Sequence, residues 1–319
     1  MKKVFKSLGI AIGVIVLALL ILLAYAYLTP MKRFPVQDIS VQLPVDSMNL
    51  AQGKKLVETV CAHCHLGEDG KLSGRLFNRK EDPFGEMWSA NITQHENGIK
   101  NYSNGELAYL MRTGVNREGR YVGNMMCHPQ MSDEMLASII AYLRSDADIV
   151  KASATQHPAP AYLNSPLIKI FAILGMFKPL PYDGQPIQAP PMTDKVAYGR
   201  YLATDVYECG VCHSQNFEMY NYFQPEESAR FFGGGCPVPD ENFEKVLSPN
   251  LTPSKEFGIG SWTEQEFMDA VKGGIKKDGN ILQPQMPRFA QLSDEEVSAI
   301  WAYLKTIPTI ESELTEPSN

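Results

Sequence analysis

The pattern of hydrophobic and polar positions begins with one long apolar stretch near the start of the chain. Residues 8–28 contain no charged side chain. A helix of that length can cross the ~30 Å hydrocarbon core of a membrane. The nearest basic residues are Lys2, Lys3 and Lys6 before the stretch and Lys32 and Arg33 after it. This slight bias favours a cytoplasmic N-terminus and an exported body. We therefore expect a transmembrane signal-anchor over residues 1–30.

A cleaved signal peptide is the alternative for the same stretch. Ala24-Tyr25-Ala26 offers the small residues of a cleavage site. The apolar run is longer than the core of an ordinary signal peptide, which favours the anchor. Either interpretation exports the rest of the chain.

Beyond the anchor the apolar positions follow a helical period, and the pattern occurs twice. Matching helix starts are Ser103 with Thr263 and Ser132 with Ser293. The first pair is followed three residues later by glutamate, which completes a capping box, and the runs that it opens end at glycines. We predict an all-α fold with two tandem domains, residues 46–150 and 195–310.

The segment between the domains, residues 151–194, is predicted to be a linker. It is rich in proline, which is typical of a chain wrapped on a surface. Within it, residues 167–177 are apolar but too short to span a bilayer. They are expected to pack between the domains, to lie on the membrane or to dock on a partner subunit, with packing inside the molecule favoured. An aromatic insert, residues 214–247, is expected to cover a cofactor edge or to form a partner surface.

Two short segments carry the candidate chemistry. Cys-Ala-His-Cys-His occupies residues 61–65, and Cys-Gly-Val-Cys-His occupies residues 209–213. The CxxCH spacing puts two thiols and an imidazole on one helical turn, where the thiols reach the vinyl groups of a haem and the histidine meets its iron. We therefore predict two covalently attached haem c groups. The predicted attachment residues are Cys61, Cys64, Cys209 and Cys212, and the predicted iron ligands on the same turns are His65 and His213.

Two other kinds of site also use paired cysteines. A thioredoxin-like CxxC follows a strand in a βαβ unit, and the helical pattern of this chain lacks that context. A zinc site needs a second pair of ligands at a suitable distance. Because both CxxCH copies lie inside the same larger repeat, neither alternative explains them.

The repeat extends to both sides of each CxxCH segment. An Ala-x-Gly sequence precedes each copy, at residues 51–53 and 197–199, and predicts a close helix crossing. Asn-Ile-Thr at residues 91–93 and Asn-Leu-Thr at residues 250–252 follow the two copies. Each repeat is therefore expected to run as helix, CxxCH, long loop, helix, loop and helix.

These motifs, together with Gly-Ile-Gly-x-Trp at residues 258–262 and Met-Pro at residues 286–287, identify a resemblance. The chain resembles class I cytochrome c domains, specifically the multihaem cytochrome c subunits of membrane-bound alcohol and gluconate dehydrogenases. Those subunits typically carry three such domains, whereas this chain has two. The resemblance implies an N-terminal helix followed by two class I cytochrome c domains.

The resemblance also implies a methionine thioether as the second axial ligand of each iron, on the loop before the last helix. Such a ligand raises the reduction potential and closes the iron to substrates. In the second domain Met286 lies seven residues before Ser293 and is the expected ligand.

The first domain is less regular at the matching position. The same spacing counted back from Ser132 gives Met125, which is the expected ligand. Met126 and His128 remain alternatives, because the proline that follows the ligand in the second domain is absent here and because imidazole also binds iron. Met131 matches Leu292 and is expected in the core.

Composition narrows the function further. The formal net charge of −7 and the absence of a basic cluster argue against nucleic-acid binding. The chain has no glycine-rich nucleotide or flavin motif, so any dehydrogenase activity would belong to another chain. The two single cysteines, Cys127 and Cys236, are expected to pack as small apolar residues.

We therefore expect a membrane-anchored electron-transfer protein without catalytic residues of its own. It would act as a carrier or as the electron-transfer subunit of a respiratory or dehydrogenase complex. Its expected partners are the membrane, a dehydrogenase or quinol-oxidising donor and a cytochrome or oxidase acceptor. Its haem domains would lie on the periplasmic face of a bacterial inner membrane. A dihaem peroxidase is the rival, because such enzymes also carry two CxxCH domains.

Overall fold

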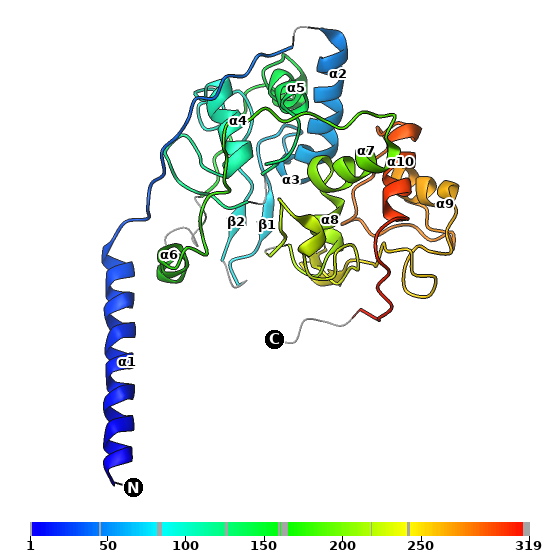
Figure 1. The fold of residues 1–319 in the computed structure, drawn as a ribbon. Helices are drawn as coiled ribbons and strands as arrows, with labels where there is room; N and C mark the ends of the chain where they lie inside the picture. Colours follow the sequence, from blue (N-terminus) through cyan, green and yellow to red (C-terminus); the bar gives the residue numbers. More distant parts are fainter. Residues whose placement is uncertain are drawn as a thin grey trace.

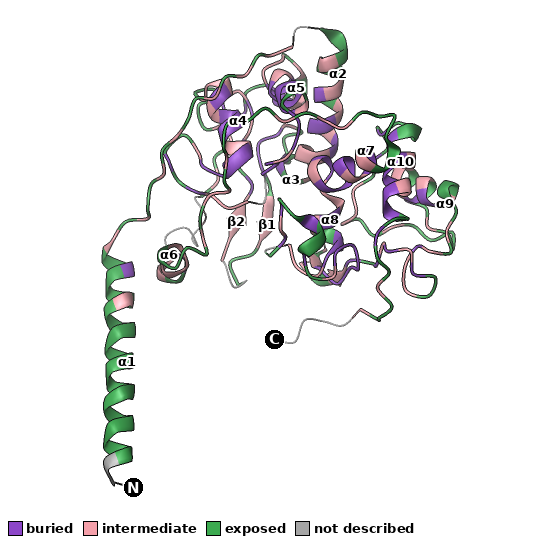
Figure 2. Ribbon diagram, in the orientation of Figure 1, coloured by how far each residue is buried: buried purple, intermediate pink, exposed green. Residues whose placement is uncertain are grey.

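The computed structural model describes residues 2–44, 46–81, 85–124, 127–158, 160, 165–217, 219–240 and 243–314. Helix α1 (Lys2–Leu28) stands apart from a body in which two groups of helices lie side by side (Figure 1). Val4–Leu28 is long and apolar enough to cross a membrane, and almost all of its side chains are exposed (Figure 2). This agrees with the anchor expected at this end of the chain.

The first group of helices contains the first CxxCH segment. Its elements are α2 (Ser47–Leu56), the wide helical turn η1 (Val57–Cys61), α3 (Ala62–His65), α4 (Asn104–Thr113), α5 (Asp133–Leu143) and the short turn η2 (Asp148–Val150). The second group repeats the order. Its elements are α7 (Lys195–Tyr201), η4 (Leu202–Val206), α8 (Cys209–His213), η5 (Pro225–Glu227), α9 (Glu264–Met268), η6 (Asp269–Gly273) and α10 (Asp294–Leu304).

Local sequence signals explain the helix ends. Ser103 and Thr263 each form a capping box with the glutamate three residues later, as predicted. Gly114 and Gly274 close these helical runs in the left-handed conformation, with φ of 75° and 73°. Glycine adopts this conformation without the steric cost that a Cβ atom adds.

The structure confirms that the two repeats are built mainly from helices, but it also contains short strands, which the all-α prediction did not include. Each long loop after a CxxCH segment contains a two-stranded antiparallel ribbon, β1 (Leu76–Asn78) with β2 (Met87–Trp88) and β3 (Pro237–Pro239) with β4 (Lys245–Leu247). Strands of two or three residues carry too few positions to show a period-two pattern. The ribbons could therefore not be predicted from the pattern of hydrophobic and polar residues.

The first and last helices of each repeat cross at a glycine. A Cβ atom at Gly53 would lie 2.0 Å from the Ser138 carbonyl oxygen, so α2 and α5 approach with their backbones almost in contact. At Gly199 a Cβ would lie 1.8 Å from the Ala299 carbonyl oxygen, between α7 and α10. The Ala-x-Gly sequences thus mark close helix crossings, as predicted.

The two repeats pack against each other through polar contacts. Lys55 Nζ lies 2.6 Å from Glu296 Oε1, and both side chains are largely buried. The backbone N–H of Ser132 donates to the Tyr201 hydroxyl at 2.8 Å. These contacts join the start of one repeat to the end of the other and fix the arrangement of the two CxxCH segments.

The linker is held along the first repeat. The Leu180 N–H donates to the Thr113 carbonyl, and Ile187 exchanges hydrogen bonds with Asp133 through its N–H and its carbonyl. We call residues 180–187 the strap. Tyr182 on the strap meets Tyr109 edge-on, with ring centroids 6.2 Å apart.

The strap contacts an ion pair that has a more open counterpart in the second repeat. Arg112 is fully buried and donates to Asp133 and to the carbonyls of His128 and Pro129. The matching pair, Lys272 with Asp294, leaves the lysine side chain 28% exposed. The linker therefore makes the first repeat different from the second.

The apolar part of the linker does not pack between the two repeats. It forms α6 (Pro166–Ile173), which contacts α1 and lies beside the end of that helix (Figure 1). Phe177, just after α6, packs on Tyr121 of the first repeat with ring centroids 4.6 Å apart. The sequence favoured packing of this segment between the two repeats. That prediction is wrong, because α6 contacts helix α1 instead.

Candidate haem sites

The first CxxCH segment is the end of one continuous helical run. η1 carries Cys61 and α3 carries Cys64 and His65, so the two thiols and the imidazole lie within about one turn. Cys64 is exposed and His65 is 9% exposed. This is the order that attachment of a haem to one side of a helix requires.

The second CxxCH segment begins its own short helix. Glu208, directly before Cys209, has a φ of 51° and separates η4 from α8. α8 then carries Cys209, Cys212 and the buried His213 on one turn. The backbone leading into the segment thus differs from the first repeat, while the three functional side chains keep their spacing.

Both histidines are oriented by a backbone carbonyl. His65 Nδ1 lies 2.7 Å from the Ala90 oxygen, and His213 Nδ1 lies 3.0 Å from the Pro249 oxygen. A ring whose Nδ1–H donates to a carbonyl leaves the Nε2 lone pair for a metal. Burial lowers the pKa of both imidazoles, which favours the neutral form that binds iron.

The asparagine motifs hold those two carbonyls in place. Asn91 Oδ1 accepts from the N–H and the hydroxyl of Thr93, and its Nδ2 donates to the Ser153 and Thr155 carbonyls. Asn250 and Thr252 repeat the first two contacts. Because each asparagine directly follows the residue whose carbonyl faces the histidine, the motif positions that histidine.

The loop before the last helix of each repeat, here called the distal loop, carries the expected methionine ligand. A matching backbone hydrogen bond holds this loop in both repeats. His128 N–H donates to the Met111 carbonyl at 2.7 Å, and Phe289 N–H donates to the Val271 carbonyl at 3.0 Å. His128 and Phe289 each lie four residues before the serine that starts the last helix of their repeat, Ser132 and Ser293. Met131 is fully buried, in line with its expected place in the core.

The structure describes one of the two expected methionine ligands, Met286. Met286 is partly buried and packs against the core beside the second repeat's helices. Met125 and its alternative Met126 lie outside the described residues. Their assignment to the first iron stays a prediction that the flanking register supports.

His128, the other alternative ligand, is engaged with the second repeat. Its Nδ1 lies 3.3 Å from Glu208 Oε1, and a ring N–H is hydrogen-bonded to the backbone of Asp205. Burial lowers the pKa of His128 to about 4 and raises that of Glu208 well above its usual value. Burial thus favours the uncharged form of both groups, although the two atoms lie at an ion-pair distance.

Burial also affects the attachment thiols, and it links the two segments. It raises the pKa of Cys212 to about 12, with further contributions from Glu208 and, across the domain boundary, from Cys64. Burial raises the pKa of Cys61 to about 12 as well, with smaller contributions from Cys64 and, across the domain boundary, from Glu208. The two CxxCH segments are thus close enough in space to interact electrostatically.

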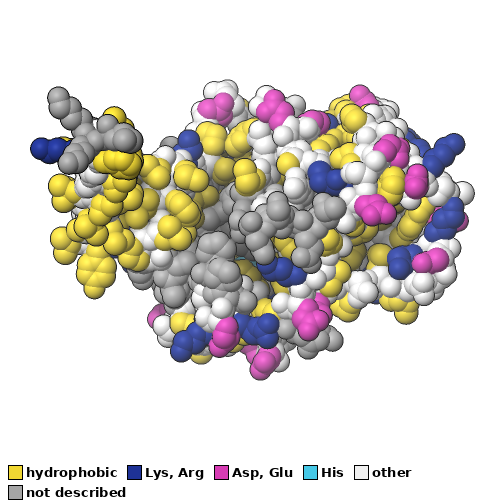
Figure 3. All heavy atoms as spheres, turned by 90° about the horizontal axis from the view of Figure 1, so that it is seen from below, with side chains coloured by type: hydrophobic (Ala, Val, Ile, Leu, Met, Phe, Trp, Pro, Cys, Tyr) yellow, Lys and Arg dark blue, Asp and Glu magenta, His cyan; other side chains and the backbone are white. Residues whose placement is uncertain are grey.

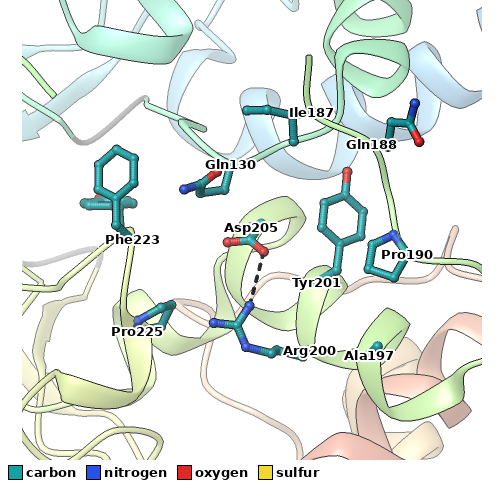
Figure 4. Close-up of a pocket in the computed structure, with 11 residues that line it drawn as sticks. Gln130, Ile187, Gln188, Pro190, Ala197, Arg200, Tyr201, Asp205, Phe223 and Pro225 are labelled. Carbon is teal, nitrogen blue, oxygen red and sulfur yellow. Dashed lines mark ion pairs between the residues drawn. The ribbon is translucent and has the colours of Figure 1, made fainter. Parts of the chain in front are cut away.

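A cleft follows the seam between the repeats. Figure 4 shows Gln130 of the first repeat facing Tyr201 and Asp205 of the second, with Ile187 of the strap at the rim. The cleft measures about 320 Å³. Arg200 lies 3.8 Å from Asp205, whose pKa burial raises to about 7.

The aromatic insert of the second repeat faces inwards as well. Tyr222 is buried and its hydroxyl donates to the Asn124 carbonyl at 3.3 Å, next to the distal loop of the first repeat. Tyr220 is buried too, and its hydroxyl is without a hydrogen-bond partner among the described residues. The insert therefore packs between the second CxxCH segment, at Gly210, and the first repeat, at Asn124, and its expected role of covering a cofactor edge stays a prediction.

The described side chains suit haem better than a simple metal ion. Among them, no group of three or more His, Cys, Asp or Glu residues is arranged to hold a metal ion. Each CxxCH turn instead presents two thiols and one oriented imidazole, next to buried aromatic and aliphatic side chains. That donor set fits a covalently bound haem.

Comparisons with known proteins give the same result. The family model described as Cytochrome c matches residues 50–146 and 196–308. The fructose dehydrogenase cytochrome subunit of Gluconobacter japonicus is 28% identical over 260 residues, which cover 78% of this chain and 50% of that protein. The cytochrome c subunit of alcohol dehydrogenase (quinone) of Gluconobacter oxydans is 26% identical over 263 residues, which cover 78% of this chain and 52% of that protein.

A shorter relative matches over most of its own length. The diheme cytochrome c-type protein of Cereibacter sphaeroides is 26% identical over 264 residues, which cover 79% of this chain and 83% of that protein. By contrast, the chain spans about half the length of the dehydrogenase subunits.

Proposed function

The chain belongs to the cytochrome c family, and from that premise we propose that it is the electron-transfer subunit of a membrane-bound dehydrogenase complex. It binds haem c covalently and transfers electrons. When bound, the haems supply reversible one-electron chemistry at iron. The observation that carries the proposal is the pair of CxxCH turns, each with a histidine oriented by a backbone carbonyl.

The protein groups have distinct roles in this proposal. Cys61, Cys64, Cys209 and Cys212 attach the haems, and His65 and His213 bind iron through Nε2. Met286 and Met125 would be the further ligands of the two irons, and a thioether ligand raises the reduction potential. His128 is disfavoured as a ligand because iron binding would break its contacts with Glu208 and Asp205.

We assign the site to electron transfer rather than to peroxide chemistry. A peroxidase needs one iron open to substrate, whereas the proposed ligands close both irons. The named relatives are cytochrome subunits of dehydrogenases, which also supports electron transfer. The oxidation of a substrate would belong to a partner chain, with α1 as membrane anchor and the haem domains on the periplasmic side.

The first test counts haem. The pyridine haemochrome assay on the full chain is expected to give two c-type haems per polypeptide. The variants C61A/C64A and C209A/C212A are each expected to keep one. Fewer than two haems in the unsubstituted protein would contradict the assignment of both sites.

The second test addresses the complex. In membranes that contain the full chain, ethanol, fructose or gluconate is added in turn, and reduction of the haem c absorption is followed. We expect one of these compounds, or a related alcohol or sugar acid, to reduce both haems. If both haems are present but none of these compounds reduces them, the protein acts as an independent electron carrier. The Cereibacter sphaeroides protein supports this alternative, because its length matches that of this chain.

A further inference from the structure

Helix α6 presents apolar side chains that the protein leaves uncovered. Ile168 is only 6% exposed, while Leu167, Ile173, Leu174 and Met176 are 54%, 46%, 62% and 70% exposed. Single exposed apolar side chains are common on protein surfaces, but several on one short helix indicate a contact with a membrane or with another molecule. The described contacts of α6 indicate which one.

The position of α6 is set by the end of α1. Ala26 is fully buried although the rest of the span is open to the surroundings, and helix α1 contacts α6. Lys169 Nζ donates to the Thr29 carbonyl at 2.8 Å, just past the end of α1. α6 is therefore tied to the last turn of α1 and not to its middle.

The length of α1 then gives the depth of that turn. At 1.5 Å per residue, Ala26 lies about 33 Å along the helix from Val4, close to the ~30 Å thickness of a hydrocarbon core. If α1 crosses the membrane, its last turn lies at the far boundary between hydrocarbon and headgroups. Tyr25 and Tyr27 are exposed there, as is usual for aromatic residues at that depth.

We propose that α6 and the turn after it lie on the outer surface of the same membrane that α1 crosses, with Leu167, Leu174 and Met176 inserted among the lipids. Figure 3 shows hydrophobic side chains gathered at the end of the molecule where α1 is attached. The exposed Lys178 follows the apolar side chains and suits anionic headgroups. The occupant of this face is thus a lipid surface, continuous with the span of α1.

The consequence is a second point of attachment. A single helix leaves a body free to tilt and rotate, whereas a helix plus an interfacial segment restricts its orientation. Because Phe177 and the strap fix α6 to the first repeat, the haem domains would keep one side towards the membrane. This inference rests on the proposed role of α1 as anchor, and the test separates the two.

The test uses the haem-loaded full chain in vesicles of phosphatidylcholine and phosphatidylglycerol that contain a lipid with a diazirine on its acyl chain. After illumination, lipid adducts are mapped on peptides by mass spectrometry. We expect adducts within residues 4–28 and also within residues 165–178, and none on the remote exposed Ile281. Adducts on α1 alone would overturn the proposal for α6 and leave the anchor intact.

A matched pair of variants sharpens the result. L174E/M176E is expected to reduce adducts on α6 about tenfold, which corresponds to a loss of about 1.4 kcal/mol of interfacial binding, and to leave those on α1 unchanged. The control M219E/I281E changes two side chains that are at least as exposed, 79% and 71%, and is expected to leave both sets of adducts unchanged. The haem spectrum reports folding of each variant.

The remaining outcomes are also decisive. Absence of adducts on both α1 and α6 would overturn the anchor and the α6 proposal together. Adducts on α6 that L174E/M176E does not reduce would show that Leu174 and Met176 do not insert among the lipids, and would overturn the proposed orientation of α6 on the membrane.

Discussion

His65 and His213 are each directed by one carbonyl oxygen, and each carbonyl is held by an asparagine next to it. This arrangement occurs twice with different neighbouring residues, Ala90 in one copy and Pro249 in the other. The shared element is therefore the backbone position and not the side chain. The cysteines and histidines could be predicted from the sequence because CxxCH fixes their geometry within one turn.

Other important residues could not be predicted in this way. Glu208 contacts His128 and Tyr222 contacts Asn124 across the two repeats, and these contacts depend on how the repeats pack. The position of Glu208 directly before the second CxxCH was the only signal in the sequence, and it gives no partner. A contact between domains has no local pattern from which it could be inferred.

The first prediction at this scale concerns Met286. M286L is expected to remove about half of the thioether-to-iron charge-transfer absorption of the oxidised protein and to lower the potential of one haem, since the thioether is what raises it. Near-infrared spectroscopy and a redox titration measure the two effects. M131L is the control, because Met131 is a core residue that matches Leu292. An unchanged absorption in M286L would assign the ligand elsewhere.

The second prediction concerns His128 and pH. Its pKa is about 4 in the folded protein, against an ordinary value of 6.5. Below pH 6.5 the unfolded chain binds a proton that the folded protein does not bind, so this group makes stability fall as the pH drops from 6.5 towards 4, and has no such effect above 6.5.

Comparison with H128Q isolates that contribution. The free energy of unfolding of the original protein minus that of H128Q is expected to decrease by up to about 3 kcal/mol between pH 7 and pH 4. Denaturant titrations of the oxidised protein at both pH values measure it. A difference that does not change with pH would mean that His128 titrates normally.

At the scale of the elements, each repeat depends on the close crossing of its first and last helices. G53A and G199A are each expected to destabilise the protein by about 1–3 kcal/mol, because the added methyl group would overlap a backbone carbonyl of the facing helix. Thermal unfolding of the haem-loaded protein measures this. G273A is the control: nothing lies within 4 Å of the added Cβ, and its effect should stay within about 1 kcal/mol. Equal effects of all three substitutions would contradict the role of the crossings.

The helices and their caps were predictable because capping boxes and glycine stops are local signals. The ribbons β1–β2 and β3–β4 were not, since such short strands form through backbone pairing after the loop has closed. The location of α6 was also beyond local inference. Its apolar sequence suits several surroundings, and only its contact with α1 selects one of them.

At the scale of the whole molecule, the closeness of the two CxxCH segments predicts electron exchange within one chain. After a light-triggered electron injection into the protein, the redistribution between the two haems is expected to have a rate independent of protein concentration. M286L makes the redistribution visible, because it separates the two potentials. A rate proportional to concentration would mean that exchange occurs between molecules, and would contradict the proximity of the segments.

The strap has a consequence for modularity. A duplicated sequence suggests two interchangeable units, each of which could be excised, reordered or replaced by the other. The buried Arg112, however, pairs with Asp133, which Ile187 of the strap contacts, whereas its counterpart Lys272 pairs with Asp294 and is partly exposed. A chimera with two copies of the second repeat would have no use for the strap, and one with two copies of the first would need it twice. The two halves are thus not interchangeable units, because the strap is bonded to the first of them.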